Sequence, residues 1–287
     1  MEIKLSLPKN NLIENLISII LCAGEGTRIS DFIHNIPKPL IKIYDKPILS
    51  HLIFNLIKLN ITSIVIITGH LRGEIETYIA SLKKGDDSLR NKLSLINSGN
   101  KYKIGPLYSF LSITDKKSIL RKDKTYIVFP GDTYYESILL KEILHVISNN
   151  LTITRNKSII FYQKMKVINL KTQLNSKKLI SIAKIEKTRS KEIVVKEIQQ
   201  RKLSDINNNE EINLIVPLFV FDYRIINKII ETERKISVTT IREILNHIIK
   251  QKNILYGVPI DLQYRFIDID TKADILSLNQ KNKGKGQ

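Results

Sequence analysis

Short apolar runs rich in β-branched residues alternate with amphipathic segments through the first half of the chain. The runs have the length and composition of buried strands, and they cover residues 16–21, 62–67, 93–96 and 125–129. Between the first two runs, Ile48, Leu52 and Leu56 recur every four residues, which predicts one apolar face of a helix. Further helices are expected near 72–82, 107–114 and 136–148.

This alternation of strands and helices predicts an α/β fold of Rossmann-like type. Its central sheet should be mixed but mostly parallel, with helices covering both faces. In such sheets ligands bind in the loops beyond the carboxyl ends of the strands. Candidate chemistry is therefore sought in the loops that follow the predicted strands.

The second half of the chain has a different pattern, in which strands follow one another across polar turns rich in Lys and Asn. The expected strands cover residues 158–163, 179–186, 192–199, 213–221, 253–257 and 264–268. Helices are expected near 223–231, 238–250 and 271–279, with Thr239 or Thr240 capping the second of these. Residues 204–211 are expected to form a polar loop.

No linker divides the chain into independent domains. We expect an N-terminal extension over 1–14, one domain over 15–280 and a disordered tail over 281–287. Within the domain, 15–150 is expected to bind a nucleotide and 151–280 its partner substrate.

Composition narrows the functional class only slightly. No apolar run reaches the roughly 20 residues that span a bilayer, and the N-terminus lacks the pattern of a signal peptide. These features predict a cytoplasmic protein without a membrane partner. One cysteine and five scattered histidines exclude an intramolecular disulfide and a cysteine-rich metal site.

The formal net charge of +18 has two interpretations. One is attraction of a polyanion, either nucleic acid or a nucleoside triphosphate. The other is compositional bias, which we favour because the lysines are spread along the whole chain. Trp is absent and the lysines do not alternate with aromatic residues, so a stacking platform for single strands is not indicated.

The most informative stretch is the segment from Leu21 to Arg28, directly after the first predicted strand. Gly24 and Gly26 let the backbone approach phosphate oxygens, and Arg28 offers them a planar fork. Shortly afterwards Lys38 stands between two prolines, which stiffen its segment. Taken singly, the glycines are also compatible with a tight turn and Lys38 with an exposed loop.

Together these two segments resemble the signature of the sugar-phosphate nucleotidyltransferase superfamily, approximately L-x-A-G-x-G-T-R followed by P-K-P-L. The motif differs from a Walker A loop and from the dinucleotide fingerprint. The resemblance implies catalytic roles for Arg28 and Lys38. It also implies nucleotide contacts from Leu21, Ala23, Gly24, Glu25, Gly26 and Thr27. The hexapeptide-repeat left-handed β-helix of some relatives is not expected.

Two later acidic segments match the same family. Pro130-Gly131-Asp132 follows a predicted strand, and relatives have a Gly-Asp there whose carboxylate binds magnesium. The segment from Asp268 to Thr271 resembles the family's second acidic element, with Asp270 where many relatives have glycine. The resemblance therefore implies Mg²⁺ as cofactor, with Asp132 and Asp268 as its ligands.

The family also suggests positions for the base and the acceptor. Asn97, Gly105 and Ser109 match the region of the base-recognition loop, and Gly69 resembles another turn near the nucleotide, although turn and cap chemistry explains all four equally well. Gln200-Arg201 stands where relatives often have Glu-Lys, whose lysine holds the acceptor's phosphate, so Arg201 or Lys202 could take this role. Lys187 takes that place in another alignment. Pro217 replaces a common glycine of the sugar pocket.

The reaction implied by the resemblance is transfer of a nucleoside monophosphate from dTTP, UTP or CTP to a small phosphorylated acceptor, with release of pyrophosphate. We expect a sugar-1-phosphate as acceptor. The alternative is a cytidylyltransferase that acts on phosphocholine or another phosphorylated alcohol or phosphonate. A catalytically silent regulatory paralogue and a nucleic-acid-binding protein are rivals of other classes. A homo-oligomer is possible; nucleic acid is not the expected partner.

Overall fold

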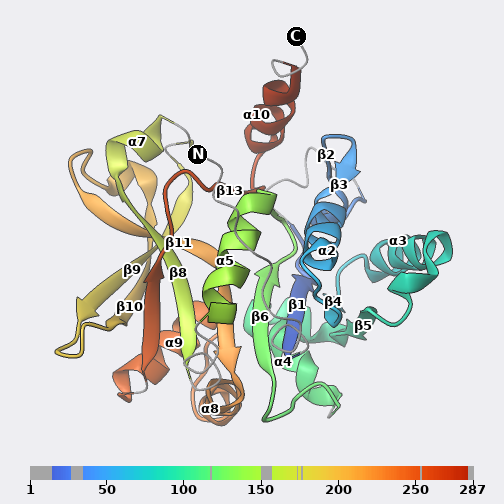
Figure 1. The fold of residues 1–287 in the computed structure, drawn as a ribbon, viewed down its shortest axis with the longest axis horizontal. Coiled ribbons are helices and arrows are strands. Elements are labelled where there is room, and N and C mark those ends of the chain that lie inside the picture. The colour runs from blue at the N-terminus through green and yellow to red at the C-terminus, as the bar shows by residue number, and fades with distance from the viewer. Residues whose placement is uncertain are drawn as a thin grey trace.

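The computed structural model describes residues 15–26, 35–116, 118–149, 157–172, 174–175, 177–252 and 254–283. Within them a nine-stranded sheet runs across the molecule, from β5 at one edge to β9 at the other (Figure 1). In spatial order its strands are β5 (Leu93–Asn97), β4 (Ile64–Thr68), β1 (Leu16–Cys22), β6 (Thr125–Pro130), β11 (Glu211–Asp222), β8 (Ser158–Lys166), β12 (Leu255–Pro259), β10 (Ile193–Lys202) and β9 (Leu179–Lys187).

The described strands of this sheet run mostly in one direction. The four strands from β5 to β6 pair in parallel, as do β8 and β12. Only β11 and β10 run the other way, because each pairs antiparallel with its neighbours. The predicted mixed, mostly parallel sheet is therefore confirmed.

Helices cover both faces of the sheet. The α-helices are α2 (Ile48–Lys58), α3 (Arg72–Gly85), α4 (Pro106–Leu111), α5 (Ser137–Asn149), α7 (Val167–Lys171), α8 (Tyr223–Glu233), α9 (Ile241–Lys250) and α10 (Lys272–Lys283). Short 3₁₀ turns lie at η2 (Lys38–Leu40), η3 (Asp87–Leu89), η4 (Gly99–Lys103), η5 (Ser112–Asp115) and η6 (Leu203–Asp205).

Two large apolar cores follow from the alternation of side chains along the strands. In β1, Leu16 and Ile20 pack into one core with buried residues of α2, α3 and α5. Ile17 and Ile19, on the opposite face, pack into another core with α4, α8 and α9. The sheet is thus buried on both faces, which explains its almost unbroken apolar runs.

Two small antiparallel pairs lie outside the main sheet. One joins β2 (Lys42–Ile43) to β3 (Lys46–Pro47), and the other joins β7 (Thr133–Tyr135) to β13 (Phe266–Asp268). The second pair brings a segment near residue 268 onto the loop that follows β6.

The predicted elements are present with ends that differ by a few residues. The sequence pattern missed the short elements β2, β3, β7 and α7. The predicted cap of α9 is Thr240, which forms a capping box with Glu243. Helix α10 continues to Lys283, so residues 281–283 of the predicted tail are helical.

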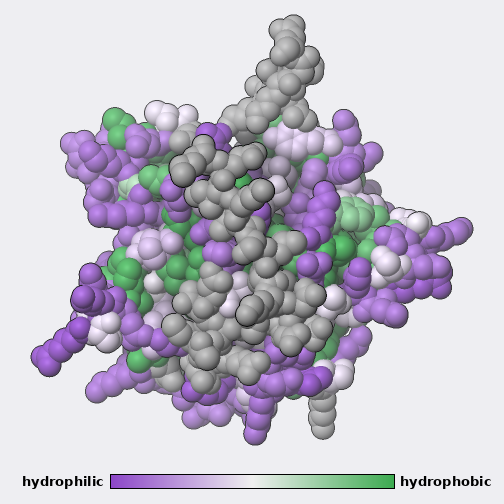
Figure 2. All heavy atoms as spheres, in the orientation of Figure 1, coloured by the Kyte–Doolittle hydropathy of each residue, from purple (hydrophilic) through white to green (hydrophobic). Residues whose placement is uncertain are grey.

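Hydrophilic side chains are spread over the visible face rather than gathered over one element (Figure 2). Among the described residues, no helix combines the length and the apolar character needed to cross a membrane.

Candidate active site

The glycine loop after β1 lies at the carboxyl ends of the parallel strands. Its Ala23 carbonyl accepts a hydrogen bond from the His70 N–H at 3.0 Å, which ties the loop to the end of β4. Gly26 has φ +66°, and a Cβ there would lie 2.9 Å from Lys38 Cγ. A side chain at position 26 would therefore collide with the stem of Lys38.

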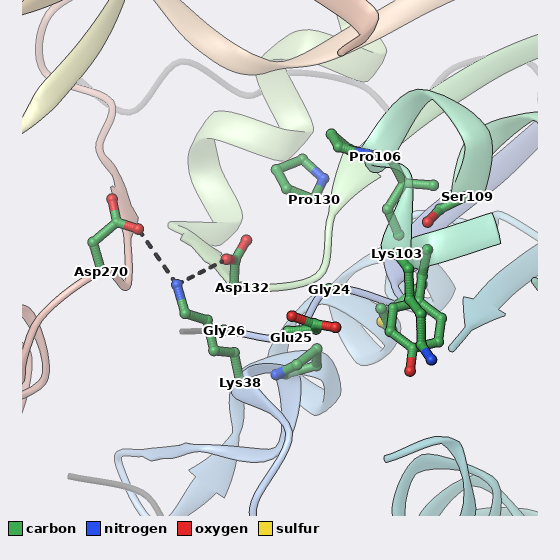
Figure 3. A pocket seen from close by; sticks show the side chains of 15 residues that line it. Gly24, Glu25, Gly26, Lys38, Lys103, Pro106, Ser109, Pro130, Asp132 and Asp270 are labelled. Carbon is green, nitrogen blue, oxygen red and sulfur yellow. Dashed lines mark hydrogen bonds and ion pairs between the residues drawn. The ribbon is translucent and has the colours of Figure 1, made fainter. Parts of the chain in front are cut away.

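Lys38 opens the 3₁₀ turn η2 and is only 8% exposed. Its ammonium lies between two carboxylates, with Nζ 3.5 Å from Asp132 Oδ2 and 3.4 Å from Asp270 Oδ1. Figure 3 shows the two carboxylates pointing toward Lys38 from different sides. A buried ammonium needs such partners, because its desolvation is otherwise costly.

Main-chain contacts bring the two aspartates together. The Ile269 N–H donates to the Asp132 carbonyl at 3.0 Å, next to the pairing of Thr133 with Asp268 in β7 and β13. On the other side of Asp132, the Gly131 N–H donates to the Leu21 carbonyl at 2.9 Å. Asp132 is therefore fixed between the glycine loop and the segment that carries Asp270.

Burial disfavours the charged form of these carboxyl groups. It raises the pKa of Asp132; the Lys38 ammonium opposes this shift and the Asp270 charge adds to it. Burial also raises the pKa of Asp268 to about 6, against the opposing effects of Lys178 and of a hydrogen bond from Thr133. A cation bound beside these groups would stabilise their charged form and oppose the effect of burial.

A cavity of 470 Å³ opens above the glycine loop. Its charged end carries Lys38, Asp132 and Asp270, and its other end carries Lys103 and Ser109 (Figure 3). The complete lining consists of Leu21, Cys22, Ala23, Gly24, Glu25, Gly26, Lys38, Pro39, Tyr102, Lys103, Pro106, Ser109, Pro130, Asp132 and Asp270.

The far end of the cavity is held by the start of α9. The Leu107 N–H donates to the Thr239 carbonyl at 3.0 Å. Gly105 has φ +149°, and a Cβ there would lie 2.5 Å from the same carbonyl oxygen. Gly105 therefore permits a close backbone contact that places Pro106 and Ser109 on the cavity wall.

The sequence of the chain matches a known protein family over most of its length. The sequence model described as "Nucleotidyl transferase" matches residues 17–281. The chain belongs to the nucleotidyl transferase family. The expected family and fold class are thereby confirmed.

Individual relatives of this nucleotidyl transferase match in different ways. The chain is 41% identical over 61 residues to the UTP–glucose-1-phosphate uridylyltransferase of Synechocystis sp.. That match covers 21% of this chain and only 16% of the relative's length. It therefore concerns one segment of each protein and does not assign an activity to the whole chain.

Solved structures resemble nearly the whole chain at low identity. A UDP-glucose pyrophosphorylase complexed with UDP-glucose has TM-score 0.67 and 15% identity, over 93% of this chain and 98% of that one. A CTP:phosphocholine cytidylyltransferase from Streptococcus pneumoniae has TM-score 0.62 and 16% identity, over 93% and 99%. At such identity these likenesses establish the fold alone.

Eight of the sixteen site residues predicted from the family resemblance line the cavity. Lys38, Ser109 and Asp132 do so, together with the loop residues Leu21, Ala23, Gly24, Glu25 and Gly26. Thr27 and Arg28 lie outside the described residues. Their roles stay predictions.

Gly69 packs against the glycine loop, and Asn97 forms a turn. A Cβ on Gly69 would lie 2.8 Å from both Ala23 Cβ and Ser98 Oγ, so this glycine permits tight packing below the loop. The Asn97 Oδ1 atom accepts a hydrogen bond from the Gly99 N–H at 2.9 Å, which is turn chemistry. Neither residue is among the cavity's lining.

The structure places Asp270 rather than Asp268 on the cavity wall. The Asp268 Oδ1 atom accepts a hydrogen bond from Thr133 Oγ1 at 2.5 Å. The family pattern points to Asp268 instead, because Asp270 stands where many relatives have glycine. Its spacing of two residues from Asp268 in an extended segment was the available signal.

Arg201 and Lys187 lie apart from this cavity and from each other. Arg201 Nη1 donates to Glu210 Oε1 at 2.6 Å. Arg201 pairs with Ile180 across β9 and β10, whereas Lys187 pairs with Ile193 at the other end of this hairpin. Ile180 and Lys187 are seven positions apart on β9, which corresponds to about 23 Å. One phosphate cannot contact both.

The donor chemistry fits a divalent cation bound together with substrate. Among the described residues, no three His, Cys, Asp or Glu side chains form a group that could hold a metal by themselves. Mg²⁺, however, is commonly held by one or two carboxylates plus substrate phosphates and water. Asp132 and Asp270 already converge on one positive charge, that of Lys38, as such a site requires.

Proposed function

We propose that this chain is a Mg²⁺-dependent nucleotidyltransferase that joins the nucleoside monophosphate of an NTP to a sugar-1-phosphate. The observation that carries this proposal is the Lys38 ammonium held between Asp132 and Asp270 at one end of a cavity floored by the glycine loop. Membership of the nucleotidyl transferase family supports the same reaction class.

In the proposed reaction, a phosphate oxygen of the acceptor attacks the α-phosphorus of the NTP. A new P–O bond forms there, the bond to the bridging oxygen of the β-phosphate breaks, and pyrophosphate leaves with the electron pair. No protein nucleophile is needed, so the chain contributes positioning and charge neutralisation.

The roles proposed for individual residues follow from their places in the structure, except that of Arg28, which follows from the resemblance to the family. Backbone N–H groups of the loop around Gly24 and Gly26 bind phosphate oxygens, and Arg28 holds the β- and γ-phosphates. Lys38 leaves its carboxylate partners and neutralises charge that develops on the α-phosphate. Lys103 and Ser109, at the other end of the cavity, contact the nucleoside.

Asp132 and Asp270 would hold the metal, and Asp268 lies beside them as the alternative second ligand. The bound cation would supply charge neutralisation of the phosphates. Arg201 is the better candidate than Lys187 for the acceptor's phosphate. The reason is that this end of the β9–β10 hairpin leads toward Asp270. Lys202, next to Arg201, pairs with Leu179, and Leu179 lines a second cavity together with Asp270.

One observation favours another acceptor. Asp270 faces the cavity at a position where many sugar-phosphate relatives have glycine, and the Asp-Ile-Asp-Thr sequence resembles cytidylyltransferases of phosphocholine and related compounds. We therefore keep CTP with a phosphorylated alcohol or phosphonate as the second candidate pair. A silent regulatory role is less favoured, because Lys38, Asp132 and Asp270 are in place together.

The test is pyrophosphate release with Mg²⁺ from each NTP, against a panel of sugar-1-phosphates, phosphocholine and related phosphorylated alcohols. Release that depends on one acceptor and one NTP is expected. Omission of the acceptor controls for NTP hydrolysis. A folded protein that releases no pyrophosphate with any pair would contradict the proposed reaction.

A further inference from the structure

Lys178 is a buried lysine that reaches the acidic segment from the other half of the chain. It lies directly before β9, and its side chain is only 7% exposed. Its Nζ atom donates a hydrogen bond to the main-chain oxygen of Asp268 at 2.6 Å. The same atom lies 3.5 Å from Asp274 Oδ1. Lys178 therefore contacts the chain on both sides of Asp270.

Asp274 completes this contact from the start of α10. Its Oδ2 atom accepts hydrogen bonds from the Asp270 N–H at 3.0 Å and from the Thr271 N–H at 2.8 Å. The Thr271 hydroxyl donates to the same oxygen at 2.9 Å. The backbone of Asp270 is thus bonded to a carboxylate that itself lies beside the Lys178 ammonium.

Lys178 and Asp274 also line a cavity together with Asp270. Lys178, Asp270, Thr271 and Asp274 line a second cavity of 170 Å³, and Asp270 lines the main cavity as well. Asp270 therefore stands between the two cavities. Its side chain faces Lys38 in one, and its backbone is held by the network of the other.

We propose that Lys178 is a positioning residue that fixes the Asp270 carboxylate for cation binding, acting through the Asp268 carbonyl and the Asp274 carboxylate. The inference rests on the proposed function for the presence of a cation. Buried hydrogen bonds to a charged donor are strong and directional, so they restrict the segment between their ends. Groups that orient a metal ligand from behind set metal affinity as well as stability.

The experiment measures Mn²⁺ binding to the folded chain in the presence of an NTP and without acceptor, from the electron paramagnetic resonance signal of Mn²⁺, with the NTP alone as the reference. The variants are Lys178→Met, Asp270→Asn and their combination. Lys177→Met is the matched control, because Lys177 is the neighbouring lysine of the same second cavity and is exposed. Thermal unfolding is recorded for each variant to separate folding from binding.

The expected result for Lys178→Met is a dissociation constant for Mn²⁺ raised about tenfold. The control should change by less than about twofold. In the Asp270→Asn background, Lys178→Met should weaken binding no further, since residues that act through one another are not additive. A purely structural lysine would lower the unfolding temperature and leave the Mn²⁺ affinity of the folded protein unchanged.

Three outcomes would overturn the proposal. The first is equal Mn²⁺ affinity in Lys178→Met and the control. The second is an effect of Lys178→Met on Mn²⁺ affinity that is as large in the Asp270→Asn background as in the wild type. The third is no Mn²⁺ binding by the wild type. If Lys178→Met does not fold, Asp274→Asn tests the other end of the network and should also weaken Mn²⁺ binding several-fold. A wild type that binds Mn²⁺ but releases no pyrophosphate contradicts the proposed function alone.

Discussion

Lys38 and Asp270 lie 232 positions apart in the chain, yet the Lys38 Nζ atom is 3.4 Å from Asp270 Oδ1. The same ammonium contacts Asp132 at 3.5 Å. One cation thus neutralises two carboxylates in the free protein. Binding of a metal and an NTP would exchange these partners, with the carboxylates passing to the metal and Lys38 to phosphate.

The first prediction concerns the carboxylates. Asp132→Asn and Asp270→Asn should each lower kcat by at least about 100-fold, because each removes charge from the proposed metal site. Acceptor-dependent pyrophosphate release measures this, with the exposed Asp261→Asn as control. Asp268→Asn tests which of Asp268 and Asp270 is the second metal ligand. A larger loss of kcat than in Asp270→Asn would assign this ligand to Asp268.

The second prediction concerns Lys38. Lys38→Met keeps the aliphatic stem that packs on Gly26 and removes the ammonium. We expect kcat/KM to fall by about 100- to 1,000-fold, since charge on the α-phosphate is then unopposed. The exposed Lys42→Met is the control on the adjacent strand β2. Equal activity of the two variants would exclude Lys38 from the chemistry.

The third prediction concerns the loop that carries Pro106. Gly105→Ala places a Cβ 2.5 Å from the Thr239 carbonyl oxygen, in a backbone conformation that side chains rarely adopt. The strain should cost about 1–3 kcal/mol of unfolding free energy and raise the KM for the NTP. Gly73→Ala is the control, because nothing lies within 4 Å of a Cβ there. Urea unfolding and initial rates measure both effects.

The fourth prediction concerns the capping box of α9. Hydrogen bonds from the Thr239 and Thr240 N–H groups hold the pKa of Glu243 below its usual 4.5. A lowered pKa in the folded state means that ionised Glu243 stabilises the fold above pH 4.5 and loses this effect as pH falls further. The loss of unfolding free energy caused by Glu243→Gln should therefore be largest at pH 7 and should shrink below pH 4.5.

Urea unfolding at several pH values measures that deficit. Thr240→Ala removes the other half of the box and should cost about 1 kcal/mol at pH 7. A Glu243→Gln deficit that stays constant from pH 7 down to pH 3 would contradict an ionic contribution of Glu243.

The fifth prediction separates the two basic residues considered for the acceptor. Arg201→Ala should raise the KM for the acceptor, and Lys187→Ala should not, since Lys187 lies at the other end of the β9–β10 hairpin. Glu210→Gln controls for loss of the ion pair with Arg201. A raised KM for the acceptor in Lys187→Ala alone would place the acceptor at the opposite end of the β9–β10 hairpin.

Much of the fold follows from local patterns in the sequence. The apolar runs behind β1, β4 and β6 are long enough to mark buried strands, and the every-fourth spacing of Ile48, Leu52 and Leu56 marks α2. By contrast, β2, β3 and β7 have only two or three residues, too few to show a period. The insertion of β12 between β8 and β10 depends on long-range pairing, which no local pattern encodes.

The site residues likewise divide into those that the sequence predicts and those that it does not. The glycine loop, Lys38 and Asp132 could be predicted, because each stands in a contiguous motif after a strand. Asp270 could not be separated from Asp268, because residues two apart in an extended segment share a direction and differ here only in their tertiary partners. Lys178 carries no sequence signal at all, since Lys177 beside it is the same residue type and lies exposed.

The pairing of β7 with β13 has a consequence for how the chain is synthesised. Ribosomes add roughly 5–20 residues per second, so Asp270 is synthesised about 10–50 s after Lys38. During that interval the nascent chain already carries the glycine loop and Lys38 but not the second carboxylate. Residues 15–150 can thus emerge and begin to fold before the proposed metal site has its second carboxylate.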